Sequence, residues 1–326
     1  MLPAPFSVLA PMEDVTDTVF RRIVLQAGPP DLFFTEFTSI DGLCSAGRPR
    51  VIGRLRYTQS ERPLVAQVWG TRPELFRRVA SEVRGMEFDG IDINMGCPVR
   101  KIVSRGACGA LIGNPTLAAE IIAATREGAG GLPVSVKTRL GVTTARGAEG
   151  WLGFLLDQGI AALTVHGRTV AQQSEGAADW SGISMAVRLR DERGLPTRVV
   201  GNGDVKTVEG FYERTAEIRV DGIMIGRGVF ENLHLFAAIS ARRDAADFSR
   251  GDFSAMSASA KVEAFRRHMI LHRDTWGTGR QFDVLKKFGK TYLRSFEGAG
   301  RLIDAVMHTR SHEAGLAVLE GWLARS

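Results

Sequence analysis

Short apolar segments alternate with helix-like stretches through roughly the first 230 residues, and this alternation restricts the fold more than any other feature of the chain. Each segment is about four to six residues long and nearly all apolar, as expected for strands buried on both faces. Eight such units predict a (β/α)8 barrel. The predicted strands are Ser7–Ala10, Leu32–Thr35, Leu64–Val68, Gly90–Ile93, Val134–Lys137, Ala162–Val165, Arg198–Gly201 and Gly222–Ile225.

Helix-like stretches lie between these strands, and prolines mark the starts of two of them. Pro73 and Pro115 stand at or just before a first helical turn, where proline is tolerated. The predicted helices include Asp17–Gln26, Pro73–Arg84, Thr116–Glu127 and Thr207–Arg214. A doubly wound parallel sheet is the alternative architecture, since it also alternates strands with helices.

The pattern changes after Phe230. Residues 241–260 are rich in Ala, Ser and Asp and are predicted to form a linker. From Lys261 onward apolar residues recur at helical spacing, and glycines separate the helical stretches. We therefore expect a barrel domain over residues 1–240 and an all-helical domain over residues 261–326.

Composition limits the classes of function. No apolar run approaches the roughly 18 residues that a membrane span needs, and the N-terminal residues do not resemble a secretory signal. The three cysteines Cys44, Cys97 and Cys108 fit neither a disulfide framework nor a metal site. These features predict a protein of the reducing cytoplasm without a bound metal. No contiguous exposed apolar helix face stands out, so we expect a monomer.

Charge is distributed unevenly along the chain. The formal net charge is +6, and residues 251–326 carry 12 basic and 8 acidic side chains. An excess of this kind is either an ordinary solvated surface or the binding surface for a polyanion.

Polar residues follow nearly every predicted strand. A single residue of this kind is more often at the surface than in a site, but their recurrence defines one rim of a barrel, where such enzymes place their sites. In strand order the candidates are Pro11, Met12 and Glu13; Glu36; Gln67; Asn94 and Cys97; Lys137 and Arg139; His166 and Arg168; Asn202, Gly203 and Asp204; and Gly226 and Arg227.

Cys97 lies in a turn directly after the fourth predicted strand. Gly96 and Pro98 favour a turn that lifts the cysteine off the strand end, whereas a structural cysteine usually lies inside an apolar run. The placement favours a reactive thiol over one that only packs the turn.

Two glycine-rich turns follow the last two predicted strands. In Gly201–Asp204 and Gly226–Gly228 the backbone N–H groups can approach a phosphate closely, and Arg227 adds a charged donor. A phosphate after strands seven and eight is a recurrent feature of barrels. The alternative is that these glycines only form tight turns.

The remaining rim residues suit an electron-rich ligand. The sequence contains no catalytic triad, Walker loop or metal-ligand cluster. Lys137, Arg139 and His166 are cations and donors that can stabilise negative charge on a cofactor or on an enolate-like substrate. This set favours a flavin, with Gln67 placed to bind the edge of its ring.

Taken together, these motifs resemble the tRNA-dihydrouridine synthases. The Asn-x-Gly-Cys-Pro and His-Gly-Arg-Thr strings are the most specific of them, and all occur in order between about residues 8 and 230. The matching segments are Ala10-Pro11-Met12 with Thr16-Asp17 and Phe20-Arg21; Asn94–Pro98 with Lys101 and Gly106; Val136–Gly141; His166–Thr169; Gly201–Asp204; and Gly222–Arg227.

The resemblance implies bound FMN, NADPH as a transient source of electrons, and a uridine of tRNA as the substrate. Reduction of the uracil 5,6 double bond needs a hydride at carbon 6 and a proton at carbon 5. Reduced flavin would supply the hydride and Cys97 the proton. An ordinary thiol, with a pKa of about 8.5, is largely protonated at neutral pH and can act as an acid.

The resemblance also implies roles for the other rim residues. Lys137 and His166 would hold the flavin ring and Gln67 would bind its edge, and Pro11, Met12 and Glu13 would also bind the cofactor. Asn202, Gly203, Asp204, Gly226 and Arg227 would bind the ribityl-phosphate, although Asp204 could only brace its turn. Residues implied at the substrate are Glu36, Asn94, Arg100, Lys101, Arg139 and Arg168.

A basic stretch in the C-terminal region fits such a substrate. Its cations are Arg280, Lys286, Lys287, Lys290 and Arg294, interleaved with Phe282, Phe288 and Tyr292. An amphipathic helix with a solvated basic face is the alternative, but a tRNA substrate favours phosphate contacts. The target base must leave its stack, at a cost of a few kcal/mol that backbone contacts would offset.

Two other functions stay open at this point. A flavin barrel that reduces a small enone or dihydroorotate would work without RNA. A non-catalytic RNA-binding protein on the same barrel would hold no flavin and would tolerate Cys97→Ala.

Overall fold

The computed structural model describes residues 2–244 and 256–325, and these form two compact units. Unit 1 comprises Met1–Thr18 and Pro30–Gly226, and unit 2 comprises Val19–Pro29 and Arg227–Ser326. The boundaries predicted at residues 240 and 260 remain predictions, since residues 245–255 lie outside the described part. One helix, α11, extends to Arg243, and another, α12, already begins at Ala258.

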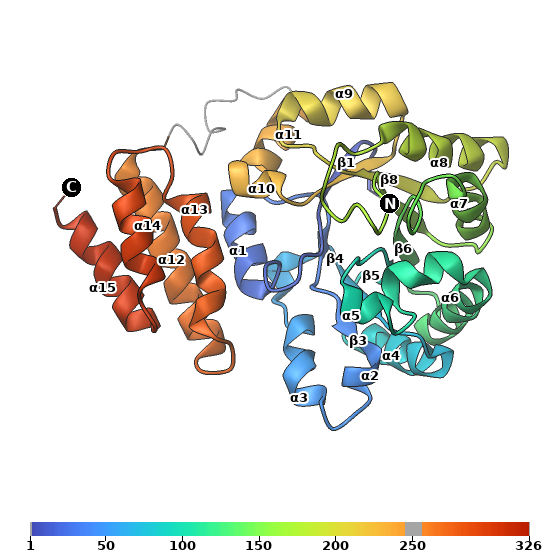
Figure 1. Cartoon of the computed structure of the whole chain (residues 1–326), viewed down its shortest axis with the longest axis horizontal. Coiled ribbons are helices and arrows are strands. Elements are labelled where there is room, and N and C mark those ends of the chain that lie inside the picture. Colours follow the sequence, from blue (N-terminus) through green and yellow to red (C-terminus); the bar gives the residue numbers. More distant parts are fainter. Residues whose placement is uncertain (1, 245–255, 326) are drawn as a thin grey trace. The chain divides into compact units, whose positions relative to one another are not determined.

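Unit 1 is built on a parallel sheet that curves into a barrel (Figure 1). The sheet of the described residues has nine strands in the order β1-β9-β8-β7-β6-β5-β4-β2, and β3 also pairs with β4. A parallel bridge between Val8 and Leu32 joins the two ends of this order. The strands are β1 Phe6–Leu9, β2 Phe33–Phe34, β3 Thr38–Ser39, β4 Leu64–Trp69, β5 Gly90–Met95, β6 Val134–Arg139, β7 Ala162–His166, β8 Arg198–Asn202 and β9 Gly222–Ile225. The predicted barrel is confirmed.

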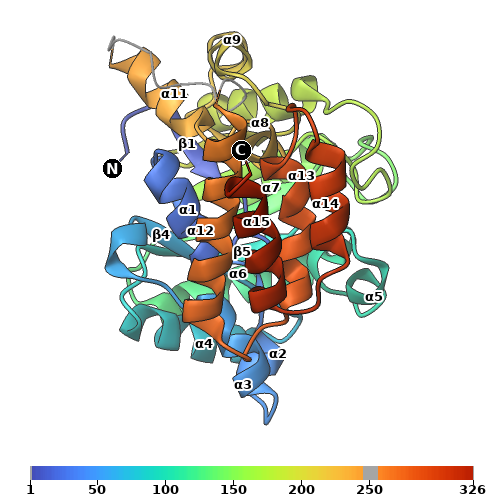
Figure 2. The ribbon, with the colours of Figure 1, turned by 90° about the vertical axis from the view of Figure 1, so that its left-hand side faces the viewer.

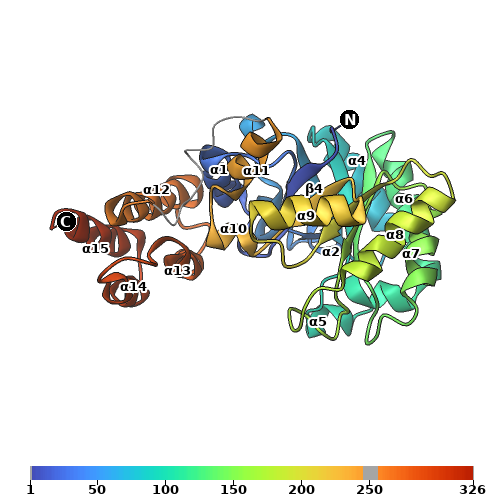
Figure 3. The same cartoon turned by 90° about the horizontal axis from the view of Figure 1, so that it is seen from above.

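Helices cover the outside of these strands, and Figure 3 shows α6, α7 and α8 around one side. The α-helices after β3 are α2 Ile40–Leu43, α3 Arg48–Val51, α4 Pro73–Gly85, α5 Arg100–Val103, α6 Pro115–Ala129, α7 Ala148–Leu156, α8 Trp180–Glu192 and α9 Val208–Ile218. The 3-10 helices of this unit are η1 Ile52–Leu55, η2 Gln59–Glu61 and η3 Cys108–Gly113.

Local sequence signals explain where these helices begin and end. The helix α6 starts at Pro115 after the cap Asn114, whose side chain accepts a hydrogen bond from the N–H of Leu117. It ends at Ala129, and the following Gly130 has a φ of 54°, in the left-handed region that favours glycine. Apolar side chains including Phe6, Val8 and Phe34 form a buried cluster in this unit.

Unit 2 is helical. Its elements are α1 Thr18–Ala27, whose first residue belongs to unit 1, and then α10 Gly228–Glu231, α11 Leu235–Arg243, α12 Ala258–Trp276, η5 Phe282–Phe288, α13 Gly289–Tyr292, α14 Ala299–Met307 and α15 His312–Leu323. The helix α12 packs against α15, which packs against α14 (Figure 2). Stacked rings add to this packing, with centroids 5.0 Å apart for Phe265 and Tyr292. None of the described helices has the length and apolar character that crossing a membrane requires.

Candidate active site

Cys97 lies in a turn that Asn94 organises. The strand β5 ends at Met95, and the Asn94 Oδ1 atom accepts hydrogen bonds from the backbone N–H groups of Gly96 (3.0 Å) and Cys97 (2.9 Å). An asparagine that bonds the backbone two and three residues ahead replaces the ladder bonds that end with the strand. The turn places Cys97 beyond the carboxyl end of β5, with 7% of the residue exposed.

Charged and sulfur-containing groups surround the Cys97 thiol. A hydrogen bond with the Cys108 thiol is the main reason why the pKa of Cys97 is lowered, to about 7. The Arg139 guanidinium acts in the same direction, whereas burial and the Glu13 carboxylate act against it. The expectation of an ordinary thiol pKa was therefore wrong. A pKa near neutrality still suits a general acid.

Arg139, at the end of β6, joins two loops of this site. Its Nε donates to the carbonyl oxygen of Gly96 at 2.7 Å. Its Nη1 donates to the carbonyl oxygens of Thr169 (2.9 Å) and Gln173 (2.7 Å), in the loop after β7. Burial lowers the pKa of Arg139 to about 10, so the guanidinium stays charged at neutral pH. Arg139 therefore both supports the Cys97 turn and supplies a positive charge beside it.

A chain of side-chain hydrogen bonds crosses the barrel below Asn94. The Asn94 Nδ2 donates to Gln67 Oε1 at 2.9 Å, and Gln67 Nε2 donates to Asp92 Oδ2 at 2.7 Å. Asp92 also accepts from Ser135 Oγ at 2.6 Å. The structure thus uses both ends of the Gln67 amide within the protein, where we had expected a contact with a ring edge.

Asp92 is a site residue that sequence reasoning missed. It is fully buried, and burial raises the pKa of its carboxyl to about 6 against the opposing effect of its hydrogen bonds and of Lys137. The signal that could have found it is a carboxylate in the middle of the apolar run Gly90–Ile93.

Lys137 lies beside this network on β6. Its Nζ donates to Asn202 Oδ1 at 3.0 Å, and Asn202 in turn donates from Nδ2 to the carbonyl oxygen of Met224 at 2.8 Å. Part of the lysine side chain stays accessible. Desolvation by the surrounding protein, together with Arg139, nevertheless lowers its pKa to about 7. A partly accessible cation whose hydrogen-bond partner is a neutral amide is suited to an electron-rich ligand.

His166, Arg168 and Asp204 form a second network. Arg168 is 2% exposed, and its Nη2 bonds both carboxylate oxygens of Asp204, at 2.7 and 2.6 Å. Its Nη1 lies 3.2 Å from His166 Nε2. Because arginine can only donate, His166 accepts at Nε2 and carries its proton on Nδ1. Asp204 also accepts from the N–H of Ala178 at 2.8 Å, which agrees with its bracing the turn after β8.

The two glycine-rich turns differ in whether a side chain would fit in place of the glycine. Gly203 has a φ of 143°, and a Cβ there would lie 2.5 Å from the Cβ of Ala178. Only glycine therefore fits that position without strain. A Cβ on Gly226 would lie 3.6 Å from the Met12 sulfur, an ordinary contact. Arg227 is the N-cap residue of α10 and belongs to unit 2.

The loop after β1 supplies Pro11, Met12 and Glu13, all partly exposed. The Met12 N–H donates to Thr16 Oγ1 at 2.9 Å, which fixes the backbone of the loop. Glu13 Oε1 accepts from Arg54 Nε at 3.0 Å, while its Oε2 is buried without a hydrogen-bond partner. Burial raises the pKa of Glu13, and the neighbouring Glu36 contributes to this.

The exposed cations expected at the substrate lie in two places. Arg100 and Lys101 are exposed on α5, three and four residues after Cys97, and follow Val99, which is 49% exposed. In unit 2, Lys287 and Lys290 are exposed.

Three cations of the C-terminal stretch make contacts within unit 2. Lys286 Nζ lies 2.8 Å from Asp283, and Arg294 donates to the carbonyl oxygen of Phe230 at 3.0 Å. Arg280 lies over the Trp276 ring. The stretch is therefore less uniformly solvent-facing than its sequence indicates.

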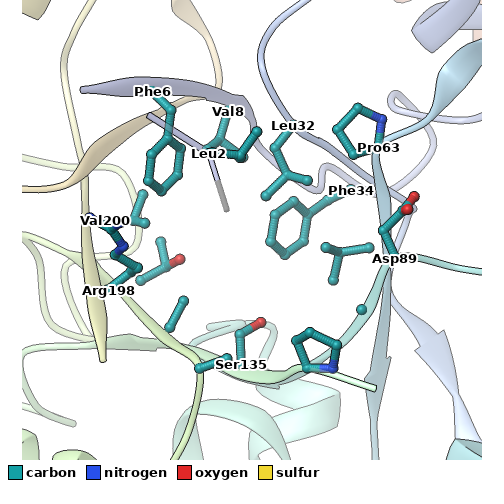
Figure 4. A pocket seen from close by; sticks show the side chains of 16 residues that line it. Leu2, Phe6, Val8, Leu32, Phe34, Pro63, Asp89, Ser135, Arg198 and Val200 are labelled. Atoms are coloured by element: carbon teal, nitrogen blue, oxygen red, sulfur yellow. The ribbon is translucent and has the colours of Figure 1, made fainter. Parts of the chain in front are cut away.

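One cavity of unit 1 is at the opposite end of the strands (Figure 4). Its volume is about 460 Å³, and it is lined mainly by apolar residues near the amino ends of the strands, among them Leu2, Phe6, Leu32, Phe34 and Val200. It contains none of the predicted site residues. No group of three potential metal ligands occurs among the residues that the structure describes.

Comparison with known proteins identifies the family. The family model for dihydrouridine synthase (Dus) matches residues 8–324. The chain belongs to the dihydrouridine synthase family. It is 42% identical to "Probable tRNA-dihydrouridine synthase 2" of Bacillus subtilis, over 98% of this chain and 94% of the relative. It is 40% identical to "Probable tRNA-dihydrouridine synthase" of Staphylococcus aureus strain COL, over 99% and 95%.

Solved structures with low sequence identity share the fold. The old yellow enzyme homologue from Zymomonas mobilis has a TM-score of 0.50 at 13% identity, over 74% of this chain and 92% of its own. A structure described as TcOYE with pHBA has a TM-score of 0.51 at 11% identity, over 72% and 88%. The family favours a dihydrouridine synthase over an enzyme for a small enone or dihydroorotate.

Proposed function

We propose that this protein reduces the 5,6 double bond of a uridine in tRNA to dihydrouridine, with bound FMN and with NADPH as the reductant. Membership of the family and the names of the two relatives support the reaction and the tRNA substrate. The three free cysteines support a cytoplasmic location. We expect the protein to act as a monomer without a stable protein partner.

The residues at the carboxyl ends of the strands fit a flavin. Lys137 offers a partly accessible ammonium group, and its hydrogen-bond partner is the neutral Asn202 amide. The turn after β8 needs glycine at Gly203, which suits close approach of a phosphate. When bound, FMN would supply the hydride for carbon 6 of the uracil.

We assign some of the residues at the strand ends to the flavin ring system and others to the ribityl-phosphate. Lys137 and His166 would lie against the ring system, as would the loop Pro11–Glu13. The buried Gln67 would support this region through its hydrogen bond with Asn94. The turns after β8 and β9 would bind the ribityl-phosphate through Gly203, Gly226 and Arg227. Asn202 and Asp204 would support this region through the lysine and through Arg168.

Cys97 carries the proposal, because a thiol on an asparagine-supported turn past β5 can present a proton to carbon 5. Its pKa of about 7 means that a substantial fraction is protonated at neutral pH, and Arg139 stabilises the thiolate left after transfer. Asn94 and Arg139 hold the turn, Arg168 and Glu36 border the region, and Arg100 and Lys101 would contact the tRNA backbone with the cations of unit 2.

The proposal is tested by separating the two half-reactions. Cys97→Ala should keep FMN and its reduction by NADPH but lose dihydrouridine formation by about 10²–10⁴-fold, the usual effect of one positioned proton donor. The matched control is Cys44→Ala, which removes a cysteine that caps α2. Normal dihydrouridine formation by Cys97→Ala would refute the role of this thiol. A purified protein without FMN would refute the cofactor.

A further inference from the structure

Cys108 has a backbone conformation that its residue type does not favour. It opens η3 with a φ of 54°, in the left-handed region that glycine adopts freely and residues with a Cβ do not. The residue is completely buried. Because this backbone conformation is unfavourable for cysteine, an interaction of the thiol is the feature that explains a cysteine here.

The Cys108 segment lies against the Cys97 turn through backbone contacts. The N–H of Gly109 donates to the carbonyl oxygen of Cys97 at 3.3 Å. A Cβ on Gly109 would lie 3.1 Å from that oxygen and 2.5 Å from Val170 Cγ2, so a larger residue would separate the two segments. The main chain thus holds the two cysteines next to each other, and the Cys108 thiol, as a hydrogen-bond donor, lowers the pKa of Cys97.

The direction of the thiol–thiol hydrogen bond follows from the surroundings of each sulfur. Burial and the neighbouring Cys97 raise the pKa of Cys108 well above its usual value, so this thiol keeps its proton. Cys97 has Arg139 beside it, and Lys137 is also near, whereas Glu13 opposes ionisation. Cys108 is therefore the donor and the Cys97 sulfur the acceptor.

We infer that Cys108 is a positioning residue for the reaction: its S–H group orients the Cys97 sulfur and stabilises the negative charge that remains there after proton transfer. The inference rests on the proposed function. In the step, the Cys97 S–H bond breaks and a C–H bond forms at carbon 5 of the uracil. The electron pair of the broken bond stays on the Cys97 sulfur, and Cys108 retains its own proton.

The first test measures the Cys97 thiol directly and needs no tRNA. The FMN-containing full chain is alkylated with iodoacetamide across a pH series, and the Cys97 peptide is quantified by mass spectrometry. Wild-type reactivity should be half-maximal near pH 7. In Cys108→Ala the midpoint should rise by about one pH unit, because the donor is lost. Cys108→Ser, which keeps an O–H donor, should stay close to wild type.

Two variants control for folding and backbone strain. Cys108→Gly also lacks the donor but suits a φ of 54°, so its midpoint should rise with that of Cys108→Ala even if its thermal stability is higher. Cys44→Ser changes a cysteine elsewhere and should leave the midpoint unchanged. A wild-type midpoint in both Cys108→Ala and Cys108→Gly would overturn the inference, as would a Cys108→Ser midpoint equal to that of alanine.

The second test connects the thiol to the reaction. Pre-reduced enzyme is mixed with unmodified tRNA in single turnovers at several pH values. The wild-type rate should fall as the pH rises through the Cys97 midpoint, and in Cys108→Ala this fall should move to higher pH with a maximal rate about tenfold lower. If the rate profile does not follow the alkylation midpoint, the role in the reaction is overturned. A wild-type enzyme that forms no dihydrouridine while the alkylation midpoints still differ would instead refute the proposed function.

Discussion

Asn94→Ala should destabilise the Cys97 turn by a definite amount. The substitution removes three hydrogen bonds, two accepted from the backbone of the turn and one donated to Gln67. Each buried hydrogen bond contributes about 1 kcal/mol net, so the free energy of unfolding should fall by about 3 kcal/mol. The buried Gln67 oxygen that loses its donor adds to this cost.

The matched control is Asn114→Ala at the start of α6. Its Oδ1 accepts a single bond, from the N–H of Leu117 at 3.2 Å, and losing such a cap costs about 1 kcal/mol. Urea unfolding of the two variants, followed by circular dichroism, compares the losses under the same conditions. A loss for Asn94→Ala no greater than that for Asn114→Ala would refute the view that Asn94 organises the turn.

The same variant should also affect the chemistry, because a small displacement of Cys97 misaligns the proton donor. We expect dihydrouridine formation by Asn94→Ala to fall by about 10²-fold, while oxidation of NADPH by the enzyme changes little. Equal losses in the two half-reactions would place the effect of Asn94 on the cofactor instead of on the thiol.

Three further outcomes are expected. Asp92→Asn should make the protein more stable above pH 6. The folded pKa of Asp92 is raised to about 6, so stability that is present below about pH 4 is lost as the pH rises to 6. Urea unfolding at pH 4 and 7 should therefore show a larger loss of stability in wild type than in Asp92→Asn, and equal losses would refute this. Gly203→Val should lower the FMN content of the purified protein more than its thermal stability; full FMN occupancy would contradict the phosphate assignment. Replacing Lys287 and Lys290 together with Ala should weaken tRNA binding and reduce the slope of log affinity against log salt by about two, about one for each phosphate that is no longer neutralised. An unchanged slope would show that neither lysine contacts a phosphate.

The strands could be predicted because they are buried on both faces and therefore form continuous apolar runs. Their carboxyl ends were predicted too early in several cases: β5 extends to Met95 and β6 to Arg139. The polar side chains there still belong to the ladder, which apolar periodicity cannot detect. The two-residue strand β3 is too short to leave a pattern.

The site could be predicted as a set of strand ends but not as a set of contacts. Cys97 was found from its turn and its motif, whereas Cys108 came into the site only through the packing of η3 against that turn. Asp92 was hidden because a single carboxylate does not interrupt an apolar run. Hydrogen bonds between residues far apart in the chain, such as Lys137 to Asn202, depend on the barrel closing.

Because α1 belongs to unit 2, its position near the start of the chain affects both synthesis and truncation of the protein. Phe20 is completely buried, and its ring stacks on Phe288 with centroids 5.1 Å apart. During synthesis Phe20 leaves the ribosome long before Phe288 is translated, so its ring lacks this contact until then. A fragment that ends near residue 240 would contain α1 but not Phe288, so the apolar side of α1 would be exposed. The C-terminal fragment would in turn lack α1, one of the helices of its own unit.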